Sequence, residues 1–181
     1  MFIDPAETAL IVIDMQERLA PAMSDFEPCA DRVAMLLAGA RELGLDAIVT
    51  EQYPKGLGPT LPRFAELLPE NTPIVAKTGF SVFEEPAFRT VLAARTRRNL
   101  VFCGIESHVC VLQSVLDALD RGFRVFLAAD AVTSRKNSDR ELALQAARAA
   151  GATVVSSEAL LFMMLRDAKN PAFKAVSKLV R

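Results

Sequence analysis

Six short apolar runs alternate with segments of helical pattern along this chain, and this alternation restricts the possible folds more than any other feature. The first run, residues 8–14, is continuously apolar and rich in β-branched residues, which is typical of a strand buried on both faces of a parallel sheet. Between the runs, apolar residues recur at helical spacing, and a glycine such as Gly44 or Gly122 ends the segment. With right-handed crossovers, the alternation predicts a three-layer α/β fold, in which helices cover both faces of a six-stranded, mostly parallel sheet. The predicted strands cover residues 8–14, 46–50, 72–77, 99–104, 123–130 and 152–155.

The length and the charge balance of the chain narrow its class. A chain of 181 residues can bury a substantial core on its own, so we expect one domain over residues 1–181. Lys and Arg (21) nearly balance Asp and Glu (22), and the one local basic cluster, at residues 95–98, is typical of a solvated helix end. We therefore expect no nucleic-acid partner.

The cysteine and histidine content argues against disulfides and metal sites. Three cysteines without paired spacing suit a reducing cytosol. A single histidine, His108, and the absence of a Cys-x-x-Cys motif leave no pattern of zinc ligands. No uncharged run is long enough to span a bilayer, and the sequence does not begin with a basic region followed by an apolar core. We expect a cytoplasmic protein without a metal, a cofactor or a membrane partner.

Three ionisable side chains follow predicted strands at their carboxyl ends. Asp14 ends the first strand, Lys77 ends the third, and Cys110 lies just after the fourth, where a helical pattern over residues 108–121 begins. Because open α/β sheets bind ligands at the carboxyl ends of their strands, we expect the three side chains to lie close together. A thiol on the first turn of a helix faces unpaired N–H groups and the positive end of the helix dipole, which favour the thiolate. The alternative is a buried structural cysteine, which this stretch alone leaves open.

Three separated motifs in one order carry a family resemblance. They are Ile-Val-Ile-Asp-Met-Gln at residues 11–16, Lys77 followed by Gly-Phe-Ser-Val-Phe at 79–83, and Cys-Gly-Ile-Glu-Ser-His-Val-Cys-Val at 103–111. Together they resemble the isochorismatase-like cysteine hydrolase family over nearly the whole chain, which implies that family's Rossmann-like fold. Within the family, the chain is most similar to members with a Gly-Ile-Glu-x-His-Val-Cys-Val motif and the loop Glu-Gln-Tyr-Pro-Lys-Gly-Leu-Gly, here residues 51–58.

The resemblance implies a Cys-Asp-Lys triad. Cys110 would be the nucleophile, Asp14 would take its proton and return it to the leaving group, and Lys77 would hold the carboxylate and stabilise the thiolate. The resemblance also implies a cis peptide bond between Ile105 and Glu106, and an oxyanion hole built from the backbone N–H groups of Glu106 and Cys110.

Six further residues are candidates for a substrate pocket. The connection over residues 51–62 is long for a link between a strand and a helix, which favours a functional role. We interpret residues 52–58, which include the only tyrosine, as a wall of the site. The two phenylalanines of residues 79–83 would pack a flat substrate, with core packing as the alternative. By resemblance, the glutamine two residues after the catalytic acid would orient that acid, with capping of a loop as the alternative. The lone histidine lies two residues before the nucleophile, so it points elsewhere on the turn and either touches substrate or has a structural role. These candidates are Gln16, Gln52, Tyr53, Phe80, Phe83 and His108.

Two departures from the family's patterns narrow the substrate. Nicotinamidase members carry an Asp-x-His metal motif with further histidines in the loop after the second strand. Here that loop is Glu-Gln-Tyr-Pro-Lys at residues 51–55, so we do not expect metal-dependent nicotinamidase activity. Isochorismatases that cleave a vinyl ether lack the cysteine that this chain keeps at Cys110, which favours a small amide, carbamoyl or related acyl substrate and a thioester intermediate. Subunits of the family often complete one another's sites, so a homo-oligomer is expected. The alternative from another class is a catalytically idle oligomer that serves as a binding or scaffold module.

Overall fold

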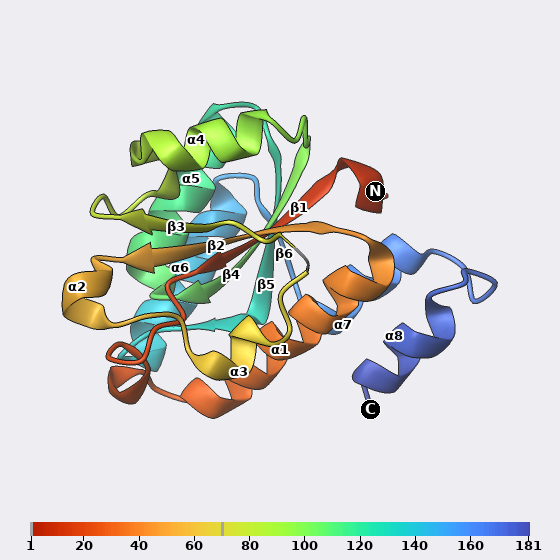
Figure 1. Cartoon of the computed structure of the whole chain (residues 1–181), viewed down its shortest axis with the longest axis horizontal. Helices are drawn as coiled ribbons and strands as arrows, with labels where there is room; N and C mark the ends of the chain where they lie inside the picture. The colour runs from red at the N-terminus through yellow and green to blue at the C-terminus, as the bar shows by residue number, and fades with distance from the viewer. Residues whose placement is uncertain (1, 70) are drawn as a thin grey trace.

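The protein is built around one six-stranded parallel sheet with helices on both faces (Figure 1). The computed structural model describes residues 2–69 and 71–181. The strands are β1 (Thr8–Ile13), β2 (Asp46–Gln52), β3 (Ile74–Lys77), β4 (Asn99–Ile105), β5 (Arg124–Thr133) and β6 (Thr153–Val155). Their order across the sheet is β3-β2-β1-β4-β5-β6. The α/β fold expected from the sequence is confirmed, and the sheet is wholly rather than mostly parallel.

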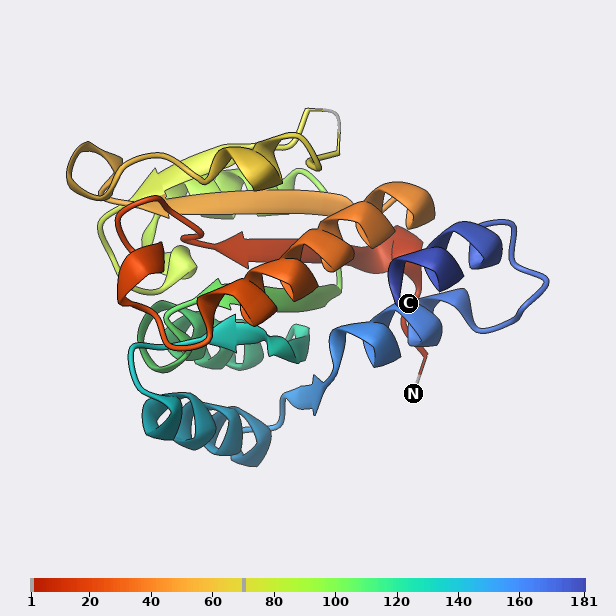
Figure 2. The same ribbon diagram turned by 90° about the horizontal axis from the view of Figure 1, so that it is seen from below.

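The helices form two layers, which pack on opposite faces of the sheet (Figures 1 and 2). The layer on one face contains α1 (Phe26–Leu43), α3 (Pro62–Ala65), α7 (Ser157–Leu165) and α8 (Phe173–Leu179). The layer on the other face contains α4 (Pro86–Ala93), α5 (Leu112–Asp120) and α6 (Asn137–Ala149). The connections hold α2 (Pro54–Leu57), three 3₁₀ turns, η1 (Pro5–Glu7), η2 (Ala20–Ala22) and η3 (Val82–Glu84), and one π-helical turn, η4 (Ser107–Val111).

The central, buried position of β1 explains why its sequence is apolar after Thr8. All six of its residues are buried, and its side chains alternate between the two helical layers. Leu10 and Val12 pack into the core under α1, whereas Ile11 and Ile13 pack into the core under α4 and α5. Burying a Val, Leu or Ile side chain contributes about 1.5–3 kcal/mol, so a strand in the centre of the sheet needs an apolar residue at every position.

Gly104 allows β4 to approach β1 closely at the carboxyl edge of the sheet. Its φ is +111°, and a Cβ atom at this position would lie 2.1 Å from the carbonyl oxygen of Ile13. No side chain fits there, and L-residues rarely adopt this φ. The glycine therefore brings the turn after β4 next to Asp14, the residue that follows Ile13.

Most strand ends differ from those expected by one or two residues, and two larger differences lie near the carboxyl edge. Strand β5 continues to Thr133 rather than ending at Asp130, and its pairing with β4 shifts register between Phe102 and Gly104. The Asp130 carboxylate accepts hydrogen bonds from the backbone N–H and the hydroxyl of Ser157, both 2.7 Å, and so holds the start of α7. The turn before α5 is a π-turn rather than the first turn of an α-helix, which changes the directions of the side chains around Cys110.

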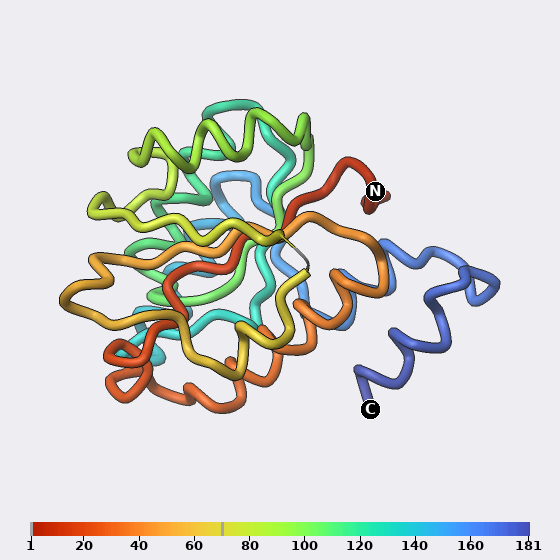
Figure 3. The backbone as a smooth tube through the Cα atoms, viewed as in Figure 1, coloured from red at the N-terminus to blue at the C-terminus, as the bar shows by residue number. Residues whose placement is uncertain are grey.

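The C-terminal segment, residues 171–181, packs on its own chain. Val176 is fully buried against the core under α1, and the ring of Phe173 meets the ring of Phe162 edge to face. Both chain ends lie on the side of the sheet opposite its carboxyl edge (Figure 3). Among the described residues, no helix combines the length and the apolar character that crossing a bilayer requires.

Candidate functional site

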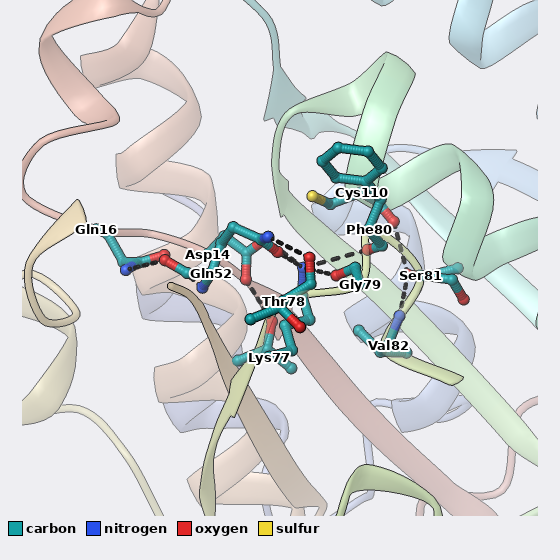
Figure 4. A network of polar contacts seen from close by, with 12 residues as sticks. Asp14, Gln16, Gln52, Lys77, Thr78, Gly79, Phe80, Ser81, Val82 and Cys110 are labelled. Carbon is teal, nitrogen blue, oxygen red and sulfur yellow. Dashed lines mark hydrogen bonds and ion pairs between the residues drawn. The ribbon is translucent and has the colours of Figure 1, made fainter. Parts of the chain in front are cut away.

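A fully buried ion pair lies at the carboxyl edge of the sheet (Figure 4). Asp14 follows β1 and Lys77 ends β3, and the lysine reaches past β2 so that its Nζ is 2.8 Å from Asp14 Oδ2. Both side chains have no exposed surface. Removing two charges from water costs several kcal/mol for each ion, so such a pair is a weak contributor to stability and points to a role in the site.

Asp14 is held by its backbone and by one hydroxyl group. Its φ is 52°, in the left-handed region that Asp adopts more readily than most residues. Its N–H donates to the carbonyl of Thr50 at 3.1 Å, and the Thr50 hydroxyl donates to Oδ1 at 2.7 Å. Among the described residues none donates a hydrogen bond to Oδ2, which has only the ion pair with Lys77. Oδ2 is thus a buried, charged acceptor that can take a proton.

Lys77 is surrounded by oxygen atoms. Besides Asp14 Oδ2, its Nζ has hydrogen bonds to Gln52 Oε1 at 2.6 Å, to the carbonyl of Phe80 at 3.1 Å and to the carbonyl of Gly79 at 3.3 Å. Three ammonium protons face these four acceptors, so the Nζ group is held in place from several sides.

Cys110 lies in η4 and contacts this pair, and burial disfavours its thiolate. The pKa of Cys110 is raised to about 12; burial is the main cause, the Asp14 charge also raises it, and the Lys77 charge lowers it. The residue is 7% exposed. The helix-start argument predicted a favoured thiolate, and the structure differs because desolvation of the thiol outweighs the nearby positive charges. Any attack by this sulfur must be coupled to loss of its proton to a base in contact.

The turn before Cys110 is fixed from two directions. The Ile105–Glu106 peptide bond is cis. The carbonyl of Glu106 accepts hydrogen bonds from the N–H groups of Val109 (3.1 Å) and Val111 (3.2 Å). The Glu106 carboxylate accepts from Arg135, through the backbone N–H at 3.2 Å and through Nε at 2.9 Å. This ties the turn to the segment that follows β5.

Gln16 and Gln52 contact each other and hold the loop of residues 52–58. Gln16 is fully buried, and its Nε2 donates to the carbonyls of Gln52 (3.0 Å) and Gly58 (2.6 Å). Its Oε1 accepts from the N–H of Gln52 at 2.8 Å. Gln16 therefore has the loop-holding role that the sequence offered as its alternative. Tyr53, which follows in the loop, is 55% exposed.

The two aromatic candidates have different environments. Phe80 is 53% exposed, and Figure 4 shows its ring beside Cys110, so it borders the site. Phe83 is buried in the core, where its ring centroid lies 5.3 Å from that of Phe88 and 6.0 Å from that of Phe123. The prediction that Phe83 lines the pocket is not supported, because η3 turns this side chain inward under α4 and α5.

His108 faces away from the ion pair. Its Nδ1 is 3.0 Å from the Ser134 hydroxyl, and its Nε2 is 3.9 Å from Asp139 Oδ2. Like the bond between Glu106 and Arg135, the contact with Ser134 joins the turn before Cys110 to the end of β5. His108 thus has the structural role that the sequence left open.

Sequence reasoning missed Thr50 and the contact between Gln52 and Lys77. Thr50 lies near the end of β2, at the same edge as Asp14, so its position in the strand could have predicted that it lies in the site. The orientation of the Gln52 amide depends on the loop and had no signal. Within residues 2–69 and 71–181, no cluster of three or more His, Cys, Asp or Glu side chains is arranged to hold a metal ion.

Comparison with known proteins gives a consistent assignment. The family model described as the isochorismatase domain matches residues 8–159. Isochorismatase domain-containing protein 2 of Bos taurus is 40% identical over 178 residues, which cover 98% of this chain and 84% of that protein. The structure of the MAR1 ribonuclease from Caenorhabditis elegans superposes with a TM-score of 0.95 at 42% identity, over 99% of this chain and 92% of that chain. YcaC from Pseudomonas aeruginosa, solved with hexane-2,5-diol and covalent acrylamide, has a TM-score of 0.91 at 26% identity, over 98% and 91% of the two chains. The sequence, the fold and these relatives together show that the chain belongs to the isochorismatase family.

Proposed function

We propose that the chain is a cysteine hydrolase that acts on a small amide, carbamoyl or related acyl substrate. Cys110 is the nucleophile, Asp14 is the base, and Lys77 is the positive charge paired with Asp14 Oδ2. The observation that supports this most strongly is the buried Asp14 carboxylate, whose Oδ2 is paired with Lys77 and which interacts with the Cys110 thiol.

The first half of the reaction forms a thioester. Asp14 Oδ2 takes the proton from Cys110 Sγ as the sulfur attacks the substrate carbonyl carbon, which gives a tetrahedral oxyanion. The oxyanion collapses, the bond to the leaving nitrogen breaks, and Asp14 gives the proton to that nitrogen. Because the pKa of Cys110 is raised to about 12, the proton moves together with the attack rather than before it.

The second half regenerates the enzyme. Asp14 takes a proton from a water molecule, which attacks the thioester carbonyl through a second oxyanion. The C–S bond breaks, the acid product leaves, and the proton returns to Sγ. The balance is one amide and one water consumed, with one acid and one amine or ammonia formed.

Lys77 lowers the cost of the charge that moves between Cys110 and Asp14. The ammonium is held in place by its hydrogen bonds to Gln52 Oε1 and to two backbone carbonyls. In this mechanism it gives no proton to the substrate. Both oxyanions would be stabilised by the backbone N–H groups of Glu106 and Cys110, an interaction worth roughly 3 kcal/mol for each donor in other hydrolases. The carboxylate of Glu106, bound by Arg135, would keep its part of the turn in position.

Two relatives inform the choice of substrates. The Pseudomonas aeruginosa protein was solved with covalent acrylamide. Acrylamide is an electrophile that adds to nucleophilic thiols, which supports a reactive cysteine in this fold. The Caenorhabditis elegans protein is titled a ribonuclease, so a single-stranded RNA belongs among the compounds tested, although the near balance of 21 basic and 22 acidic residues disfavours it.

We also propose a location and an assembly state for the protein. The cysteine pattern favours the cytoplasm, and the family resemblance favours a homo-oligomer. Light scattering coupled to gel filtration measures the assembly directly, and a monomer at working concentration would contradict that part.

A substrate screen tests the proposed function. Small amides, N-carbamoyl compounds and an RNA oligonucleotide are incubated with the wild-type chain and with Cys110→Ala, and released amine, ammonia or cleaved RNA is measured. We expect hydrolysis of an amide or carbamoyl compound that Cys110→Ala abolishes. Hydrolysis that survives in Cys110→Ala would contradict the mechanism, and binding without turnover would favour the idle module.

A further inference from the structure

We propose that Gln52 is a positioning residue, which holds the Lys77 ammonium against Asp14 through its side-chain amide. The inference rests on the proposed function, because it assigns Gln52 a part in keeping the Cys110, Asp14 and Lys77 arrangement together. The sequence placed Gln52 in the substrate pocket, but both polar atoms of its side chain have partners inside the protein (Figure 4).

The amide of Gln52 has only one favourable orientation. Its Oε1 accepts from Lys77 Nζ at 2.6 Å, the shortest of the lysine's polar contacts. Its Nε2 donates to the carbonyl of Thr78 at 2.7 Å, in the residue that directly follows Lys77. A flipped amide would direct its NH₂ group at an ammonium and its oxygen at a carbonyl, and both contacts would be repulsive. Gln52 therefore recognises the lysine side chain and the backbone after it at once.

The position of Gln52 in the sheet explains why the lysine needs such a guide. Lys77 ends β3, a four-residue strand at the edge of the sheet, and its flexible side chain must reach past β2 to Asp14 on the far side. Gln52 is the β2 residue paired with Lys77 in the register of the two strands. A lysine is a charge on a flexible stem with three rotatable donors, so its direction is set by the acceptors around it.

Gln52 is itself attached to the segment that carries Asp14. Gln16, two residues after Asp14, binds the backbone of Gln52 on both sides, through Oε1 to its N–H (2.8 Å) and through Nε2 to its carbonyl (3.0 Å). Gln16 is fully buried, so these bonds are shielded from water. Asp14 and Lys77 are therefore connected in two ways: directly by the ion pair, and indirectly by the hydrogen bonds from Gln16 to Gln52 and from Lys77 to Gln52.

Two variants separate this role from a merely structural one. Gln52→Met keeps the length of the side chain but removes the acceptor, so the lysine loses its shortest contact. Gln52→Glu keeps the shape and the acceptor and adds a negative charge beside Lys77. Gln145→Glu, the same substitution on an exposed position of α6, is the matched control for net charge.

Two readouts need no substrate. The first is the pH dependence of Cys110 alkylation by iodoacetamide, followed by peptide mass spectrometry. The second is the ¹H–¹⁵N signal of the Lys77 ammonium group, assigned by its loss in Lys77→Met, because a buried ammonium with several hydrogen bonds exchanges its protons slowly. Both are measured on the full chain.

We expect Gln52→Met to broaden or shift the Lys77 signal. Because Lys77 lowers the pKa of Cys110, a displaced lysine should also slow Cys110 alkylation at fixed pH by about tenfold, the equivalent of one pKa unit. We expect Gln52→Glu to keep the Lys77 signal and to move the alkylation profile to higher pH, since a second carboxylate disfavours the thiolate. Gln145→Glu should match the wild type in both readouts.

Wild-type Lys77 signals and wild-type alkylation profiles in both Gln52 variants would overturn the inference. If Gln52→Met does not fold, Gln52→Leu, which also lacks the acceptor, takes its place with the same expected results and the same overturning outcome. A failed substrate screen together with the expected alkylation and ammonium results would count against the proposed function and leave the positioning role standing.

Discussion

Breaking the buried ion pair from one side should destabilise the protein strongly. Asp14→Asn keeps the size of the side chain, tolerates the left-handed backbone at φ 52° and can still accept from the Thr50 hydroxyl. It leaves the Lys77 ammonium fully buried with three neutral oxygen atoms and no negative charge. Removing one partner of a buried pair costs about 3–5 kcal/mol, and we expect the lower end, about 3 kcal/mol, because the neutral acceptors remain.

A double-mutant cycle measures how much of this cost is electrostatic. Lys77→Met leaves the Asp14 carboxylate buried without its counter-charge and should cost a similar amount. Asp14→Asn with Lys77→Met removes both charges, so we expect the double variant to lose much less than the sum of the single variants. The coupling free energy should be about 3 kcal/mol, from urea unfolding at pH 7.

An exposed ion pair supplies the control for this cycle. Glu27 Oε2 lies 2.7 Å from Arg63 Nη1, but the Glu27 side chain is 74% exposed. Glu27→Gln makes the same change from carboxylate to amide as Asp14→Asn and should cost less than about 1 kcal/mol, because water screens the pair. Additive losses in the Asp14 and Lys77 cycle would refute the reasoning, since they would mean that the two charges do not depend on each other.

Three further predictions concern the core and the turn before Cys110. Gly104→Ala should prevent folding or lower the free energy of unfolding by more than about 3 kcal/mol. Gly122 also has a positive φ but has open space around it, so Gly122→Ala should cost only about 1–2 kcal/mol in urea unfolding. Equal losses would contradict the close approach of β4 to β1 at Gly104. Burial raises the pKa of Cys103 well above its ordinary value of 9.0, so the folded state keeps a proton that the unfolded chain releases, and stability should fall as pH rises above 9. Cys103→Ala should make that fall less steep by up to about 1 kcal/mol per pH unit, and an unchanged slope would argue against the raised pKa. Arg135→Ala should slow Cys110 acylation by a p-nitrophenyl ester by roughly tenfold with little change in stability, since it loosens the Glu106 carboxylate; an unchanged rate would show that this bond does not position the turn.

The parts of the fold that follow from burial were predictable from the sequence. A strand such as β1 must be apolar at every position if helices cover both faces of the sheet, and that pattern is local. The placement of Asp14 and Lys77 at one edge follows from the parallel direction of β1 and β3 alone. Boundaries were less predictable, because the register shift in β5 and the π-turn of η4 arise from tertiary contacts rather than from propensity.

The features of the site that depend on side-chain direction were not predictable. Phe80 and Phe83 are three residues apart in one loop, yet Phe80 borders the site, whereas Phe83 lies in the 3₁₀ turn η3 and is buried in the core. The pKa of Cys110 depends on how completely the turn is covered, and sequence position near a helix start gave the wrong direction. The Gln52 amide could be read only from the distances to its partners.

The most direct test of the central claim is acylation of Cys110 by p-nitrophenyl acetate. The release of p-nitrophenolate gives the rate, and peptide mass spectrometry of the acid-quenched enzyme gives the site of the acetyl group. If Asp14 is the base, the wild-type chain should carry the acetyl group on Cys110, and Asp14→Asn should slow its formation by about 10²–10⁴-fold. Acetylation of Cys29 or Cys103 in place of Cys110, or an equal rate in Asp14→Asn, would contradict the claim.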